Sequence, residues 1–187
     1  MKQIRPAAVA VGSIGIVAAA ASIGAVPGTS GFLGAGLALL MLAIAVVDYR
    51  YLIIPNELNA AALALAVINT VVADPAAIVN GLGSAALRGL ITMLFFLSIR
   101  TAYRWLRQRE GLGLGDVKLA FVAGTWLDWP MIPVAIEIAA LAALMIYSAW
   151  RVFGSRPIGP MSRLPFGLFF APAIWLSWLI GALLVAL

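Results

Sequence analysis

Seven long apolar segments separated by short turns constrain this chain more than any other feature of its sequence. A helix that crosses a bilayer needs about 20 mainly apolar residues, with a range of roughly 17–25. Since 64% of the residues are hydrophobic and only 10% are charged, a soluble fold is excluded. We predict an all-α fold, a polytopic integral membrane helical bundle. Its segments are Ala7–Val26, Phe32–Val47, Leu58–Val72, Leu82–Tyr103, Val117–Leu127, Met131–Trp150 and Pro165–Leu187.

The number of crossings depends on the fifth segment, which is short. The residues that follow it, Asp128-Trp129-Pro130, form either a loop or a re-entrant bend, so we predict six or seven transmembrane helices. No segment leaves room for a soluble domain. We therefore expect one membrane-embedded domain over 1–187, with an extra N-terminal helix in 1–30 and a core in 32–187. The opening resembles a signal peptide, but its apolar run and poor cleavage site favour a retained helix.

The basic residues predict how the chain is oriented in the membrane. With the N-terminus in the cytoplasm, the alternate loops that face the cytoplasm carry the Arg residues, whereas the other loops carry only Asp74 and Asp128. This pattern predicts an outside C-terminus and a multi-pass protein of the cell inner (cytoplasmic) membrane. The net charge is +5, and the basic residues that produce it lie next to the apolar segments. We therefore expect the lipid bilayer as a partner and do not expect a nucleic acid. The 12 basic residues are Lys2, Arg5, Arg50, Arg88, Arg100, Arg104, Arg107, Arg109, Lys118, Arg151, Arg156 and Arg163.

The residue types that are missing limit the chemistry. The chain has no cysteine and no histidine, which excludes disulfides, thiolate nucleophiles, histidine bases and zinc sites built from either residue. Any hydrolysis must therefore use carboxylates, and we expect neither a metal nor another cofactor. Seven carboxylates are available: Asp48, Glu57, Asp74, Glu110, Asp116, Asp128 and Glu137.

Two of these carboxylates are predicted to meet at one face of the membrane. Asp48 ends the second apolar segment and Asp116 heads the fifth, so both lie at the cytoplasmic boundary. Two carboxyl groups that share a site titrate as a pair, one serving as the base and the other as the acid. The alternative for each residue alone is an interfacial charge or a helix cap.

The sequence around the two aspartates carries a more specific signal. Asp116 closes Gly111-Leu112-Gly113-Leu114-Gly115-Asp116 and precedes Val-Lys-Leu, and Asp48 stands shortly before Ile54-Pro55-Asn56. A third element, Pro165-Phe166-Gly167, precedes the last apolar segment. In these elements the sequence resembles the GxGD-type prepilin peptidases of type IV pilus and related secretion systems. The match runs from about residue 32 to the C-terminus, with Leu168 in place of a second proline.

The resemblance implies a membrane aspartic endopeptidase that removes the short leader of a prepilin or pseudopilin. It implies catalysis by Asp48 and Asp116. Because the cysteine-containing insert of the larger members is missing, N-methyltransferase activity is not expected, and the small forms that process Flp-type pilins of tight-adherence systems are more similar. Archaeal preflagellin peptidases are nearer than presenilin and its relatives. The residues expected to contact the substrate are Gly113, Gly115, Pro55, Asn56 and Lys118.

Several residues have competing interpretations. We expect Asn56 to cap the third helix, with Glu57 complementing the helix dipole, or else their turn to shape a substrate groove. Lys118 either steadies an ionised Asp116 or extends to the interface. The two intramembrane charges, Arg88 and Glu137, are predicted to pair. The cluster from Arg100 to Arg109 is expected to anchor the membrane boundary.

Two other functions remain open at this point. One is a small transporter in which membrane carboxylates relay protons or bind cations, although the aspartates cluster at one face and no internal repeat is evident. The other is an inactive pilus-assembly factor, against which intact Asp48 and Asp116 argue.

Overall fold

A computed structural model describes residues 4–108, 111–153 and 165–186, and this part of the chain is helical with no strand. The all-α prediction is therefore confirmed. Four basic residues on which the predicted orientation partly depends lie outside the described residues: Lys2, Arg109, Arg156 and Arg163. The elements are α1 (Ile4–Ala25), α2 (Thr29–Tyr51), α3 (Asn56–Ala73), a 3₁₀ turn η1 (Pro75–Ala77), α4 (Ile78–Arg107), α5 (Leu114–Trp126), α6 (Met131–Phe153) and α7 (Phe166–Ala186).

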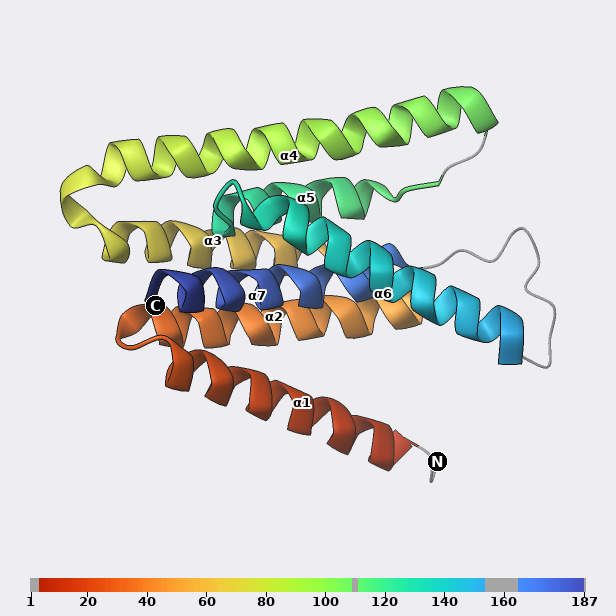
Figure 1. The fold of residues 1–187 in the computed structure, drawn as a ribbon, viewed down its shortest axis with the longest axis horizontal. Coiled ribbons are helices and arrows are strands. Elements are labelled where there is room, and N and C mark those ends of the chain that lie inside the picture. Colours follow the sequence, from red (N-terminus) through yellow and green to blue (C-terminus); the bar gives the residue numbers. More distant parts are fainter. Residues whose placement is uncertain (1–3, 109–110, 154–164, 187) are drawn as a thin grey trace.

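The helices run up and down along one common direction, and each reverses the direction of the one before it (Figure 1). Six of them are long and apolar enough to cross a membrane, and α5, with 13 residues, is the exception. We predicted six or seven crossings; the described residues form seven α-helices, and six of these are long enough to cross. The two ends of the chain lie at opposite ends of the bundle (Figure 1).

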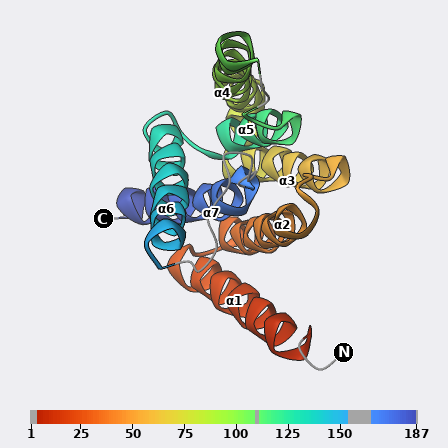
Figure 2. The ribbon, with the colours of Figure 1, turned by 90° about the vertical axis from the view of Figure 1, so that its right-hand side faces the viewer.

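The short helix α5 lies in the interior of the bundle. It packs between α4, α3 and α7, while α1 lies outside α2 and α6 lies beside α7 (Figure 2). The side chains of α5 are apolar almost all round, as expected for a helix enclosed by others. Its buried residues join those of α2 and α7 in one core, whose largest fully buried members are Leu37, Met41, Ile44, Leu119, Val122, Leu127, Phe170 and Ile174.

A glycine sets the close approach of α5 to α4. A Cβ added at Gly124 would lie 2.5 Å from the carbonyl oxygen of Arg88, so only glycine fits there. On its other side α4 exposes large apolar side chains such as Leu87, Leu90 and Ile91. Exposed apolar surface of this extent is typical of a helix that faces lipid.

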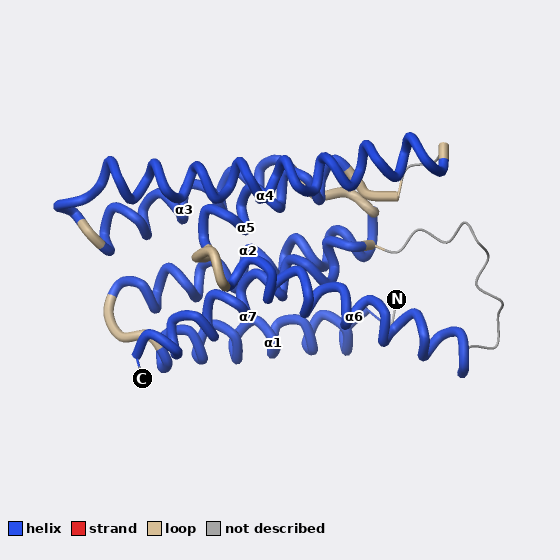
Figure 3. The backbone as a smooth tube through the Cα atoms, turned by 45° about the horizontal axis from the view of Figure 1, so that its top comes forward, coloured by secondary structure: helices blue, strands red, loops and turns tan. Residues whose placement is uncertain are grey.

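The turn between α5 and α6 lies partway along the bundle rather than at its end. The α1–α2 and α3–α4 connections lie at one end of the bundle, whereas the α5–α6 loop lies nearer its middle (Figure 3). Thirteen helical residues rise only about 20 Å, whereas the hydrocarbon core is about 30 Å thick. Non-helical backbone at membrane depth is tolerated only where it is buried in protein or lines a water-filled cavity. The turn at Asp128-Trp129-Pro130 is therefore expected to line such a cavity.

Candidate active site

Asp48 and Asp116, 68 residues apart in the sequence, line one cavity of about 260 Å³. Asp48 lies in the last turn of α2 and Asp116 in the first turn of α5, and both are buried, with 5% and 8% of their surface exposed. We call this the carboxylate cavity. Its other lining residues are Leu52, Ile53, Ile54, Gly113, Leu114, Gly115 and Lys118.

The first turn of α7 holds the Asp48 carboxylate. The backbone N–H of Leu168 donates a hydrogen bond to Asp48 Oδ2 at 2.9 Å, and the N–H of Gly167 is a second donor to this carboxylate. A Cβ added at Gly167 would lie 2.8 Å from the same oxygen, so a side chain there would displace the carboxylate. The start of a helix offers unpaired N–H groups and a partial positive charge, which suit an anion.

The loop before α5 holds the Asp116 carboxylate in the same way. The N–H of Gly113 donates to Asp116 Oδ2 at 3.0 Å. Asp116 lies outside the six helices long enough to cross the membrane. The pKa of Asp116 is raised to about 6, mainly by burial and also by nearby Asp48, while the Gly113 hydrogen bond and Arg100 oppose this rise. The two carboxyl groups thus influence each other electrostatically.

Arg100 is a member of the site that the sequence did not reveal. It is buried on α4, with 8% of its surface exposed, and its guanidinium donates to the carbonyl oxygen of Leu112 in the loop before Asp116. Arg100 is therefore not an exposed charge at the membrane boundary, whereas Arg104 and Arg107 of the same cluster are exposed. No local pattern could have shown this, because the contact depends on how α4 and the loop fold together.

The sequence also does not identify Gly167 as a site residue, although it indicates the motif that contains it. Pro165-Phe166-Gly167 stands at the start of α7, where the structure places it against Asp48. A motif so far from both aspartates does not by itself indicate which of them it contacts.

Gly115 and Ile54 bring α5 against the turn that follows α2. A Cβ added at Gly115 would lie 3.0 Å from the Ile54 Cβ, which is a tight contact. That turn begins at Leu52, which ends α2 in the left-handed conformation with φ of 55° and donates its N–H to the Asp48 carbonyl. The chain thereby places Ile53 and Ile54 on the wall of the cavity.

The roles predicted for Asn56 and Lys118 need correction. Asn56 is the first residue of α3 and Pro55 occupies the cap position, which makes no side-chain capping bond. The Asn56 amide oxygen instead accepts a hydrogen bond from Lys118 Nζ at 2.8 Å. Lys118 lines the carboxylate cavity but ties α5 to α3 rather than pairing with Asp116. Glu57 lies in the first turn of α3, as expected.

The predicted pair of Arg88 with Glu137 is wrong. Arg88 Nη1 lies 3.6 Å from Asp128 Oδ1, and Arg88 Nε donates to the Gly124 carbonyl oxygen at 3.3 Å. Glu137 is exposed on α6. The physical reason is that α6 packs against α7, whereas the turn after α5 carries Asp128 to α4.

The fold is that of a polytopic helical membrane protein. Two buried carboxylates in one cavity give it a candidate acid–base site at one end of the bundle. Residues 35–148 match the model of the type IV leader peptidase family, so the chain belongs to that family. The resemblance to prepilin peptidases that the sequence motifs indicated is confirmed.

Three curated relatives show the extent of the similarity, and each is named a prepilin leader peptidase/N-methyltransferase. The Dichelobacter nodosus protein is 31% identical over 145 residues, which cover 76% of this chain and 46% of the relative. The Pectobacterium carotovorum protein is 28% identical over 70% of this chain and 45% of the relative. The Pseudomonas aeruginosa protein is 25% identical over 75% and 47%. The chain thus matches less than half of each relative. No solved structure matches it.

Proposed function

We propose that this chain is an aspartic endopeptidase that removes the leader of a prepilin-like substrate by activating water between Asp48 and Asp116. The observation that carries the proposal is the shared cavity, in which two buried carboxyl groups receive different backbone donors. Peptide hydrolysis on carboxylates needs one ionised and one protonated group. Unequal surroundings favour that division of roles.

Asp116 is the partner that keeps the shared proton. Its pKa is raised to about 6, mainly by burial and in part by the nearby Asp48 charge. We assign the ionised role to Asp48, since the N–H groups at the start of α7 donate to its carboxylate and so oppose the effect of its burial. The two groups titrate together, so the apparent pKa values of catalysis belong to the pair.

The reaction then follows from these protonation states. Asp48 accepts a proton from a water molecule whose oxygen attacks the scissile carbonyl carbon. Asp116 donates its proton to the carbonyl oxygen, which gives a neutral tetrahedral intermediate. When the intermediate collapses, the proton on Asp48 passes to the leaving amine and Asp116 recovers its proton from the hydroxyl group. Water is consumed, and no group on the enzyme changes covalently.

The substrate class rests on the family and on the names of the relatives. We propose a prepilin or pseudopilin, with a Flp-type pilin as the first candidate, whose apolar helix lies in the inner membrane beside the enzyme. Its extended cleavage segment would lie against the backbone of Gly113–Gly115 at the cytoplasmic face. We further propose that this chain cleaves without N-methylating the product.

Co-expression with a Flp-type prepilin tests the proposal. Wild type should produce a shorter pilin on a gel, whereas Asp48→Asn and Asp116→Asn should each leave the precursor uncut at equal abundance in the membrane. Glu137→Gln, which alters an exposed carboxylate of α6, is the matched control and should cleave normally. Cleavage by either aspartate variant would overturn the proposed mechanism.

The mass of the mature pilin tests the second part of the proposal. We expect an unmodified N-terminal residue in cells that express this chain as their only prepilin peptidase. An N-terminal methyl group that depends on this chain would contradict it.

A further inference from the structure

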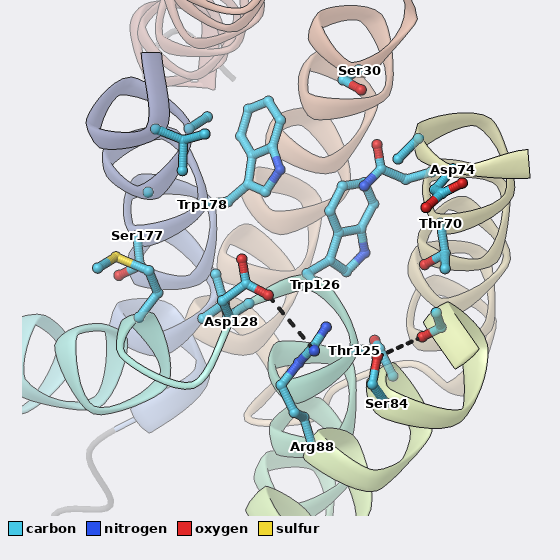
Figure 4. Close-up of a pocket in the computed structure, with 18 of the residues that line it drawn as sticks. Ser30, Thr70, Asp74, Ser84, Arg88, Thr125, Trp126, Asp128, Ser177 and Trp178 are labelled. Carbon is cyan, nitrogen blue, oxygen red and sulfur yellow. Dashed lines mark hydrogen bonds and ion pairs between the residues drawn. The ribbon is translucent and has the colours of Figure 1, made fainter. Parts of the chain in front are cut away.

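A second and larger cavity lies at the end of the bundle opposite Asp48 and Asp116. Its volume is about 560 Å³, and Figure 4 shows charged, hydroxyl and indole side chains around it. We call it the Arg88 cavity. It lies among the last turns of α3, α5 and α7, the first turns of α2, α4 and α6, and the loop at Asp128.

The position of Arg88 places a permanent positive charge within the membrane. It lies ten residues into α4, and Leu87, Leu90 and Ile91 around it are exposed as lipid-facing side chains are. Ten helical residues rise about 15 Å. An arginine at such a depth is costly unless an anion or water accompanies it. Its side chain is 14% exposed, so it forms part of the cavity wall.

The protein neutralises this charge only loosely. The 3.6 Å between Arg88 Nη1 and Asp128 Oδ1 exceeds hydrogen-bonding distance, and the Asp128 side chain is 80% exposed. The Gly124 carbonyl oxygen accepts from Nε and so fixes the guanidinium in place. A planar guanidinium held in this way can still donate to two oxygens of a phosphate.

The rim of the cavity carries the opposite charge. Asp74 and Asp128 are both exposed and both line it, so a ligand with a positive group would be held as well. Ser177 Oγ and Asn69 Oδ1 are buried in the wall, and neither has a hydrogen-bond partner among the described residues. Unpaired buried polar atoms usually indicate a bound water or ligand. Together these groups suit a zwitterion rather than a simple anion.

An apolar groove continues from this cavity. Its volume is about 350 Å³, it lies between α3, α4 and α5, and it shares Thr70 and Thr125 with the Arg88 cavity. Both threonine hydroxyls donate to carbonyl oxygens of their own helices, to Ala66 at 3.0 Å and Val122 at 2.7 Å. The other lining residues are apolar: Leu63, Ala66, Val67, Leu82, Ala85, Ala86 and Phe121.

We propose that the Arg88 cavity and this groove form a binding site for a zwitterionic aminophospholipid of the phosphatidylethanolamine type. The phosphate lies on Arg88, the ammonium group lies between Asp74 and Asp128, and one acyl chain lies in the groove. A charged head next to an apolar groove matches the shape of a phospholipid. The site is separate from the proposed peptidase site.

Native mass spectrometry of the delipidated full chain tests this assignment without any peptidase assay. The protein is incubated with equal amounts of phosphatidylethanolamine, phosphatidylglycerol and phosphatidylcholine that carry identical acyl chains. Phosphatidylethanolamine should be retained best, and soluble phosphoethanolamine should not displace it at equal concentration. Preferential retention of phosphatidylglycerol, or no retention of any lipid, would overturn the proposal.

Variants identify the groups responsible. Arg88→Met should lower retention of phosphatidylethanolamine roughly tenfold, since a charged hydrogen bond is lost, whereas Arg104→Met, exposed at the other end of α4, should not. Asp128→Asn should remove the preference over phosphatidylcholine. Retention that Arg88→Met leaves unchanged, or a preference that survives Asp128→Asn, would contradict the assignment.

A groove variant keeps the test valid if Arg88→Met does not fold. Ala86→Phe adds a ring at an exposed position of the groove and leaves the charged groups intact. It should lower the retention of two-chain lipids several-fold, whereas Ala140→Phe on the exposed face of α6 should have no effect. Equal retention by both variants would show that the groove holds no acyl chain.

Discussion

At the scale of single residues, the two candidate catalytic groups are chemically identical, and only their surroundings separate them. Asp48 receives backbone N–H groups from the start of α7, and Asp116 receives one from Gly113. Asp116 has a pKa raised to about 6, chiefly by burial. Perturbed pKa values of this kind concentrate at functional sites. A raised carboxyl pKa also lowers the stability of the folded protein at neutral pH, and a substitution can measure this loss.

Replacing Asp116 by asparagine should stabilise the protein at neutral and alkaline pH while abolishing cleavage. The folded protein binds this proton up to a pKa of about 6, whereas the unfolded chain releases it near 3.8. The folded state therefore loses stability as the pH rises from 3.8 through 6, on the order of 3 kcal/mol in full. The asparagine amide is neutral at every pH, and its oxygen can still accept from Gly113.

Thermal unfolding in detergent at about pH 8 and about pH 4 measures this effect. The Asp116→Asn variant should unfold at a higher temperature than wild type at the higher pH, and the difference should shrink at the lower pH. Glu137→Gln, on an exposed group, should show no such dependence. A lower unfolding temperature for Asp116→Asn at the higher pH would contradict the role of burial.

At the scale of helices, the sequence predicts where each helix lies along the chain better than it predicts which helices pack together. Hydropathy located all seven helices, but it predicted Leu82–Tyr103 where α4 spans Ile78–Arg107, because the helix continues beyond its apolar part. The meeting of Asp48 and Asp116 in one cavity was predictable, since their depth and motifs agree. Arg100 and the pairing of Arg88 with Asp128 were not, because both depend on which helices pack together.

The start of α7 is the packing feature with the clearest consequence for the site. Gly167→Ala would place a Cβ 2.8 Å from both Asp48 Oδ2 and Ile54 Cδ1, so either the carboxylate or the helix must shift. We expect cleavage to fall at least about tenfold, with stability lowered by about 1–3 kcal/mol as for other overpacked sites. Gel-shift cleavage rates and unfolding temperatures measure the two effects.

Gly83→Ala is the matched control, because a Cβ at Gly83 meets nothing within 4 Å. Alanine inside an exposed helix is also favoured over glycine. This variant should therefore cleave normally and be at least as stable as wild type. If Gly167→Ala cleaved as fast as Gly83→Ala, the first turn of α7 would have no part in positioning Asp48.

At the scale of the whole molecule, the two cavities lie at opposite ends of one bundle, and the length of α5 explains both. Its first turn carries Asp116 to the carboxylate cavity, and its last turn lines the Arg88 cavity. The helix ends short of the ends of its neighbours (Figure 3). A full-length fifth helix would fill that space. The proposed peptidase and lipid sites therefore face opposite sides of the membrane.

The orientation of the bundle can be tested directly because the chain contains no cysteine. Gln108→Cys and Ala76→Cys place single thiols at exposed positions, the first at the C-terminal end of α4 and the second in η1 at the opposite end of that helix. If Asp48 and Asp116 face the cytoplasm, a membrane-impermeant thiol reagent should label Ala76→Cys in intact spheroplasts. It should label Gln108→Cys only after the membrane is opened. The reverse pattern would place the carboxylates outside the cytoplasm, where the leader of a prepilin that has not yet been exported could not reach them.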